Sequence, residues 1–426
     1  MARSDPRPLF PVRILYLCHR IPYPPDKGEK IRAYHQIAQL ARRHEVHLVS
    51  FGERPYDPAN AEALRRICAS VEIVQRPLFT AAVGSLGALL GTRPLSIAAY
   101  DSKAVRTAVA KRCRATPPDV ALVYSAAMAP FAERMACPRL LDFVDVDSEK
   151  WRVYGERMRP PMSFVYAAEA TRLATYEARM AEVFDHSILV SEAERRILAA
   201  RVPGLRASVI PNGVDLEYFR PAAGQGDPGD PRPEIRPRAV FVGMMDYYPN
   251  CDAVAYFAKE ILPSVRAEIP DFEFHVVGRR PTAVVRALGR LPGITVTGGV
   301  PDVRPHLMEA LVAVAPFRIA RGIQNKVLEA MACAIPVVGT SLAFQGIPAA
   351  VRDGIRIADE PGALAGLIVE LARTPSLRAE RGGAARAYVE RHHRWDAVAA
   401  ALEGVLERLI DADRGRSPAS LREARS

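Results

Sequence analysis

The sequence lacks a long hydrophobic run. No stretch of its 426 residues reaches the roughly 20 consecutive apolar residues that a membrane-spanning helix needs. The nearest approach is PLFTAAVGSLGALLGTRPLSIAAY, from Pro77 to Tyr100, in which Arg93 is the only charge and glycine and proline interrupt the pattern. We therefore expect a protein that does not cross a membrane. This stretch forms either a packed pair of helices or a peripheral contact with a membrane surface.

The sequence also lacks paired metal or redox motifs. It has six cysteines with no CxxC and no Cys/His spacing of a zinc site, and its first residues show no secretion signal. These features predict buried, reduced thiols in a cytoplasmic protein. The cysteines are Cys18, Cys68, Cys113, Cys137, Cys251 and Cys333.

Two further absences narrow the function. No GxGxxG follows the first predicted strand, which disfavours a nicotinamide oxidoreductase. No aromatic RNA-binding motif accompanies the basic residues, although the net charge is +10 and the pI about 9.4. We expect phosphorylated substrates or anionic lipid as partners, and no nucleic acid.

Short apolar runs alternate with stretches of helical period, the pattern of βαβ units and parallel sheets. The series occurs twice. It predicts an N-terminal Rossmann-like domain at 1–205 and a second Rossmann-like domain at 238–392, separated by a hinge and a Pro/Gly/Asp-rich linker at 206–237. The fold class is α/β, with two doubly wound domains and the active site expected in a cleft at the carboxyl ends of both sheets.

The chain closes with three helix-like stretches and a polar end. We expect a helix at 393–412 and a disordered tail at 413–426, because the final residues contain few apolar side chains.

The segment APFRIARGIQNKVLEAMACAIPVVG, from Ala315 to Gly339, contains the most informative motif. A loop with Arg318 and Arg321 precedes a helix that begins near Asn325, and Lys326 lies in its first turn. A helix N-terminus offers unpaired N–H groups and a positive dipole end. These groups together predict a diphosphate site.

Two residues complete this motif. Gly322 lets the backbone approach a ligand closely. Glu329, three residues after Lys326, lies on the same helical face, where its carboxylate can accept hydrogen bonds from the two hydroxyls of a ribose. The alternative is a solvated amphipathic helix with an ordinary Lys/Glu surface pair.

Three strings, LEAMACAIPVVGT, VIPNGVD and FVGMMDYYPN, closely resemble glycosyltransferase family 4. The resemblance implies a GT-B fold, a retaining mechanism, a nucleotide-sugar donor and a C-terminal helix that packs back on the first domain. In that family two glutamates separated by seven residues mark the donor site. Glu329 matches the second, whereas Arg321 stands at the first.

Many family members also have an arginine and a lysine after the first strand of the second domain. This chain has Gly243 followed by MMDYYPN instead. We expect Arg318 and Lys326 to replace that pair at the phosphates. Gly243, and Gly278 at the end of FEFHVVG, are expected to line the donor site.

A narrower resemblance exists. LYLCHRIPYPPDKGEKIRAYHQIAQLA, LDFVDVDSEKW and GIQNKVLEAMA resemble sugar transferases associated with PEP-CTERM/exosortase exopolysaccharide gene clusters. It implies addition of a sugar to a lipid-linked glycan precursor at the cytoplasmic face of the inner membrane, with possible peripheral contact there.

The loop IPYPPDKGEKIR follows the first strand and predicts an acceptor or phosphate loop. Lys27 and Arg32 make it cationic, and Gly28 at the helix entrance can admit a phosphate or a hydroxyl. His19 is a further candidate at the same strand end. The alternative is a proline-stiffened turn with solvated charges.

Asp145 and Asp147 form a DxD string after the strand LLDFV. In another transferase fold such a pair holds a divalent cation, but two Rossmann-like halves argue against that fold. Here the pair can hold or deprotonate an acceptor hydroxyl. The alternative is that Asp147 or Ser148 caps the following helix.

We therefore predict a glycosyltransferase that moves a hexose to a glycan or lipid-linked acceptor. Arg318 and Lys326 stabilise the leaving diphosphate, Asn325 begins the helix that assists them, and Glu329 holds the ribose. No metal and no cofactor are needed when cationic side chains neutralise the leaving group. The alternatives are a nucleotide-sugar epimerase of the same fold and a non-catalytic scaffold of a polysaccharide assembly complex.

Overall fold

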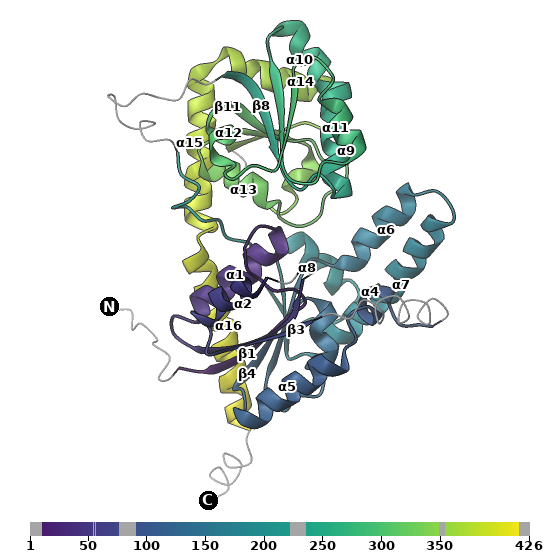
Figure 1. Cartoon of the computed structure of the whole chain (residues 1–426), viewed down its shortest axis with the longest axis vertical. Helices are drawn as coiled ribbons and strands as arrows, with labels where there is room; N and C mark the ends of the chain where they lie inside the picture. Colours follow the sequence, from purple (N-terminus) through teal and green to yellow (C-terminus); the bar gives the residue numbers. More distant parts are fainter. Residues whose placement is uncertain are drawn as a thin grey trace, which may run out of the picture. The chain divides into compact units, whose positions relative to one another are not determined.

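The computed structural model describes residues 11–53, 55, 57–75, 91–221, 236–348 and 354–416 (Figure 1). Most of the predicted membrane-contact stretch, most of the predicted linker and the last ten residues lie outside this part of the chain. The chain divides into two compact units. The N-terminal unit combines Met1–Ile210 with Trp395–Ser426, and the C-terminal unit is Pro211–Arg394.

The described residues of the N-terminal unit form a parallel sheet of seven strands in the order β3-β2-β1-β4-β5-β6-β7. Its central strands are largely buried, such as RILYLC, in which only Arg13 is partly exposed, and VALVY, as expected where helices cover both faces. The strands are β1 (Arg13–Cys18), β2 (Glu45–Gly52), β3 (Ser70–Gln75), β4 (Val120–Tyr124), β5 (Arg139–Val144), β6 (His186–Leu189) and β7 (Ala207–Val209).

Helices cover both faces of this sheet. On one face, Ile14 and Tyr16 pack with residues of α1, α2 and α16. On the other, Leu15 and Leu17 pack with residues of α5, η1, α7 and α8. The helices of the unit are α1 (Gly28–Leu40), α2 (Pro58–Arg65), α4 (Leu95–Ala98), α5 (Lys103–Ala115), η1 (Ala126–Phe131), α6 (Asp147–Arg157), α7 (Met162–Val183), α8 (Glu192–Ala199) and α16 (Trp395–Arg416).

The described residues of the C-terminal unit form a second parallel sheet, of six strands in the order β10-β9-β8-β11-β12-β13. In this order β8 and β11 are neighbours at the centre, which is the topological switch point of a doubly wound sheet. The strands are β8 (Arg236–Val242), β9 (Glu273–Val277), β10 (Ile294–Gly298), β11 (Ala310–Ala315), β12 (Val337–Gly339) and β13 (Ile355–Ile357).

The helices of the C-terminal unit enclose one continuous apolar core around this sheet. They are α9 (Tyr248–Tyr256), the π-helical η2 (Phe257–Ile261), α10 (Leu262–Glu268), α11 (Ala283–Leu288), α12 (Arg304–Met308), α13 (Asn325–Ala332), η3 (Ser341–Phe344), α14 (Pro361–Arg373) and α15 (Pro375–His392). No helix in the described ranges is both long enough and apolar enough to cross a bilayer.

Two predicted boundaries differ from the structure. The expected hinge at 206–237 contains β7, which pairs with β6 and extends the first sheet, so the division between the units falls after Ile210. The last helix starts at Trp395 and continues to Arg416, beyond the predicted end at 412. Its polar final turns are exposed and remain helical without contributing to a core.

Candidate functional site

The carboxyl ends of β8 and β9 approach each other closely in the C-terminal unit. A β-carbon built on Gly278 would lie 1.6 Å from the carbonyl oxygen of Gly243, so a side chain there would collide with the neighbouring backbone. A β-carbon on Gly243 would lie 2.8 Å from the Nζ of Lys326 and 2.8 Å from the Nδ2 of Asn250. Gly243 therefore leaves the space that the Lys326 ammonium occupies.

Lys326 is held in this space by an amide and two aromatic rings. Its Nζ donates to the Oδ1 of Asn250 at 2.6 Å and lies 4.4 Å and 4.9 Å from the ring centroids of Phe241 and Phe317. Asn250 is buried, and its Nδ2 donates to the carbonyl of Met244 at 2.8 Å, which directs Oδ1 toward the lysine. The ammonium thus lies at the end of β8 on a fixed support.

Burial shifts the ionisation of the first turns of α13. Loss of hydration lowers the pKa of Lys326 to about 7, although the nearby Glu329 acts in the opposite direction. Burial likewise raises the pKa of Glu329 to about 7, against the effect of Lys326. An anion that binds beside Lys326 would favour its charged form, so the site is suited to a phosphate group.

The loop before α13 also takes a defined shape. Gly322 has a φ of +60°, a left-handed conformation that favours glycine. The backbone carbonyl of Arg321 accepts a hydrogen bond from the Nε2 of Gln324 at 2.8 Å. At the helix start, the Oδ1 of Asn325 accepts from the Nδ2 of Asn212 at 2.9 Å, which ties the PNGVD turn to α13.

Arg318 is directed toward α9. Its Nε lies 3.0 Å from Oδ2 of Asp252, and its guanidinium lies 4.8 Å from the ring centroid of Tyr256. The side chain is 47% exposed, so it remains accessible while paired. The structure therefore places Arg318 in a surface ion pair, and its proposed role at a leaving group stays a prediction.

The structure thus brings Gly243, Gly278 and Lys326 together, with Glu329 one turn further along α13. The reasoning from sequence missed the support of the lysine. Asn250 ends the string FVGMMDYYPN but carried no role, because only the fold shows that it faces a residue 76 positions later.

In the N-terminal unit, the predicted cationic loop is balanced by carboxylates. Gly28 begins α1, and Lys27, just before it, lies 3.6 Å from a carboxylate oxygen of Glu53. Arg20 donates to Glu29 at 2.7 Å. Burial opposes the charge of Glu29, but nearby His19, Arg20 and Lys27 outweigh it and lower the Glu29 pKa to about 2. The loop is therefore an ion-pair network rather than a simple cationic surface.

His19 is part of this network. Its ring stacks on Tyr124 with centroids 5.8 Å apart and an interplanar angle of 6°. Its Nε2 lies 3.8 Å from a carboxylate oxygen of Glu29, and its side chain is 12% exposed. These contacts fix the ring, and its role toward an acceptor stays a prediction.

Arg32 was predicted to belong to the phosphate loop, but it lies in the core. It is fully buried on α1, and its Nε donates to Oδ2 of Asp142 at 2.9 Å. The same oxygen accepts from Gln36 at 2.8 Å, and Gln36 accepts from Tyr16 at 2.6 Å. A guanidinium enclosed in this network beneath the sheet surface does not reach a substrate.

Asp145 and Asp147 follow β5 through a strained backbone, since Val144 has a φ of +68°. Neither Asp147 nor Ser148 is the N-cap residue of α6. Asp147 is its first residue, the N-cap position is Val146, and the Val146 N–H donates to the buried Glu194 at 2.8 Å. The capping alternative is therefore wrong, and a role at an acceptor hydroxyl stays a prediction.

Glu177 lies behind this turn, and its ionisation makes the stability of the N-terminal unit depend on pH. Burial raises the pKa of Glu177 to about 8, aided by the charge of Asp147 and opposed by hydrogen bonds from Ser148. Between pH 4.5 and pH 8 the folded unit keeps a proton that the unfolded chain releases. The free energy of unfolding should thus fall as pH rises through this window, by up to about 1.4 kcal/mol per pH unit.

We expect Glu177→Gln to flatten this slope in urea unfolding followed by tryptophan fluorescence at both ends of the window. Glu182→Gln, at an exposed position of α7, is the matched control and should retain the slope. An unchanged slope in Glu177→Gln would contradict the assignment.

Comparisons with known proteins identify the class. Residues 236–374 match the family model described as glycosyl transferases group 1. No curated protein matches the chain. The match shows a group 1 glycosyltransferase domain within residues 236–374.

Solved structures agree on the fold over nearly the whole chain. Sucrose-phosphate synthase from Thermosynechococcus elongatus gives a TM-score of 0.69 at 17% identity, covering 94% of this chain and 100% of that one. Anabaena Alr3699/HepE in complex with UDP gives 0.63 at 14% identity, covering 93% and 100%. A glycosyltransferase from Rickettsia africae ESF-5 gives 0.64 at 14% identity, covering 94% and 99%. The fold is therefore GT-B, and with the group 1 domain it defines the protein as a glycosyltransferase.

Proposed function

We propose that this enzyme transfers a hexose from a nucleotide sugar to a glycan or lipid-linked acceptor, with retention of configuration, in exopolysaccharide assembly. One observation supports the donor site above all others. The Lys326 ammonium lies partly buried over Gly243, held by Asn250 at the carboxyl end of β8, where doubly wound sheets bind their ligands.

In this proposal Lys326 neutralises the charge that develops on the leaving diphosphate. The N-terminus of α13 adds its unpaired N–H groups and its positive dipole end. Glu329, one turn further along, accepts hydrogen bonds from the ribose hydroxyls. The reaction is then assisted mainly by fixed charges and positioning, without a metal or a cofactor.

Arg318 has a secondary role in this mechanism. Its pair with Asp252 is half-exposed, and ion pairs of this kind contribute little free energy, so the guanidinium can exchange its carboxylate for a phosphate. Arg321, at the position of the family's first glutamate, would approach the transferred sugar as a hydrogen-bond donor rather than an acceptor. This exchange favours a donor sugar that presents an acceptor or an acidic group there.

Two further observations support the substrate class. The Anabaena protein with the same fold is described in complex with UDP, with UDP and glucose, and with UDP-glucose. The strings that resemble PEP-CTERM-associated sugar transferases support an acceptor in exopolysaccharide assembly at the cytoplasmic face of the inner membrane. Peripheral membrane contact is part of the same proposal.

A calorimetric screen of the full chain against UDP, GDP, ADP and their sugars tests the donor site. We expect one nucleotide to bind with micromolar affinity and Glu329→Ala to weaken it by about 10- to 100-fold, because a carboxylate is lost from two hydrogen bonds. Glu260→Ala, at an exposed position of the same unit, is the control. If no nucleotide binds, or if both variants bind alike, the donor site is wrong and a non-catalytic scaffold is favoured.

A further inference from the structure

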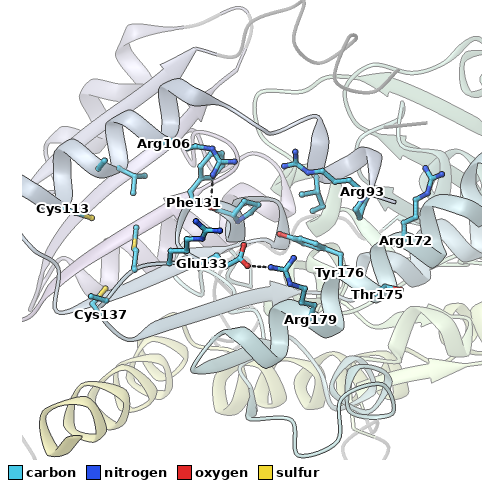
Figure 2. Close-up of a pocket in the computed structure, with 18 of the residues that line it drawn as sticks. Arg93, Arg106, Cys113, Phe131, Glu133, Cys137, Arg172, Thr175, Tyr176 and Arg179 are labelled. Carbon is cyan, nitrogen blue, oxygen red and sulfur yellow. Dashed lines mark hydrogen bonds and ion pairs between the residues drawn. The ribbon is translucent and has the colours of Figure 1, made fainter. Parts of the chain in front are cut away.

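A large groove opens in the N-terminal unit, away from the residues assigned so far. It has a volume of about 1580 Å³ and is lined by residues of α5, of α7, of the segment around η1 and of the segment that leads into α4 (Figure 2). Neither the donor site nor the predicted acceptor loop contributes a lining residue. A cavity of this size is larger than most small-molecule sites and can hold an extended ligand.

The lining charges are predominantly positive. Five arginines line the groove against a single lining carboxylate, Glu133; the arginines are Arg93, Arg106, Arg134, Arg172 and Arg179. Figure 2 shows Arg106 and Arg93 along the upper side of the drawn residues, Arg172 at the right and Arg179 beside Glu133.

Three of these arginines form ion pairs with two carboxylates. Arg93 and Arg106 share Asp101, each at 2.7 Å, and Arg179 pairs with Glu133. These arginine side chains are 43–60% exposed, so their guanidinium groups face the solvent-filled space. An anion would find several donors along the rim.

The floor is apolar. Ile97, Val109 and Phe131 are buried beneath the rim, and Met135 also lines the groove. Arg106 lies over the Phe131 ring at 5.2 Å, which joins the cationic rim to the apolar floor. The groove thus combines apolar and cationic side chains.

The face of α7 that lines the groove continues to an exposed apolar end. Positions 171, 172, 175 and 179 line the groove and are related to position 164 by steps of three and four residues, so they share one side of the helix. Phe164 is 72% exposed and Met162 is 44% exposed at the start of α7. Exposed apolar side chains beside arginines are typical of surfaces that meet lipid.

We infer that this groove binds one molecule of a lipid phosphate. Its isoprenoid or acyl chain would lie on the apolar floor, and its phosphate would lie at the arginine rim. The inference rests on the proposed function, because it identifies the lipid-linked acceptor as a class of molecule. Charge complementarity and the apolar floor favour this occupant over an acidic glycan, which would need more hydroxyl and amide partners than the floor offers.

Binding of geranylgeranyl phosphate to the full-length protein tests the inference. We expect saturable 1:1 binding that weakens with added salt, since charges contribute to it. The double variant Arg134→Glu/Arg172→Glu should weaken binding about tenfold or more, and Val109→Trp should weaken it similarly by filling the floor. Geranylgeraniol and inorganic phosphate should each bind at least about tenfold more weakly than the intact amphiphile.

The matched control is Arg66→Glu/Arg196→Glu. It makes the same change in net charge at exposed positions of the same unit outside the groove, and should bind like the wild type. All variants should retain nucleotide binding, which separates this inference from the donor-site proposal.

Several results would overturn the inference. If geranylgeraniol bound as tightly as geranylgeranyl phosphate, the site would be purely apolar. If inorganic phosphate bound as tightly as geranylgeranyl phosphate, the site would be a simple anion site. If the protein bound only to phosphatidylglycerol vesicles, the groove would be a membrane-docking surface. If an acidic oligosaccharide displaced geranylgeranyl phosphate, the groove would be a glycan site. Unchanged affinity in both groove variants would place the ligand elsewhere.

Discussion

Replacing Lys326 with alanine should lower kcat for donor cleavage by about 10²- to 10³-fold. The variant loses the ammonium that Asn250 and two aromatic rings hold at the end of β8. A charge that acts on the leaving diphosphate contributes mainly in the transition state, so kcat should fall more than the affinity for the donor. Release of the nucleoside diphosphate from the donor found in the binding screen measures this.

A second variant keeps the charge and moves it. Gly243→Ala places a methyl group 2.8 Å from the Nζ of Lys326 and 2.8 Å from the Nδ2 of Asn250, so the ammonium must shift. The activity of this variant should therefore also fall. Lys259→Ala, at an exposed position of the same unit, serves as the control for net charge. Activity of Lys326→Ala within about twofold of the wild type would remove Lys326 from the mechanism.

Replacing Arg32 with methionine should lower the free energy of unfolding of the N-terminal unit by about 3–5 kcal/mol. The substitution leaves Asp142 ionisable and buried without its main cation, and a buried charge without a partner is costly. The double variant Arg32→Met/Asp142→Leu should recover most of the loss, since neither charge then remains in the core.

Tryptophan fluorescence during urea unfolding is a selective measurement of this effect. The chain has two tryptophans, Trp151 and Trp395, and both belong to the N-terminal unit. Arg43→Met, an exposed position on the same unit, is the control. Equal midpoints for Arg32→Met and wild type would show that the pair contributes nothing to stability, and a double variant no more stable than the single would contradict the charge argument.

The pattern of the sequence predicted the two sheets because their central strands are short, mainly apolar runs between helical stretches. The helical period from Met162 to Val183 predicts a helix there, and α7 has the same bounds. The pattern from Cys251 to Ala267 predicts one helix, whereas the structure has α9, η2 and α10 in succession from Tyr248 to Glu268. The π-helical turn depends on tertiary packing, which periodicity does not reveal.

The error at Arg32 was avoidable from the sequence. Arg32 lies beside Ala33 and one turn before Gln36, on the side of α1 that also carries Ile37. Asp142 interrupts the otherwise apolar strand RLLDFV. A cation on a buried helix face and an acid within a buried strand together indicate an internal ion pair.

The support of Lys326 was not predictable in the same way. Asn250 lies in another helix, and its orientation depends on a hydrogen bond to the Met244 carbonyl. The groove was likewise invisible, because its arginines come from four separate segments of the chain. Such sites are created by the fold and have no local pattern.

The N-terminal unit is discontinuous, and this determines the order in which the two units can mature. During synthesis, Pro211–Arg394 leaves the ribosome as one uninterrupted stretch, whereas the N-terminal unit waits for α16 at the end of the chain. Until then Ile14 and Tyr16 lack the helix that covers them. A chain cut after Arg394 should therefore aggregate through this open face, so the last helix determines whether the protein can be isolated.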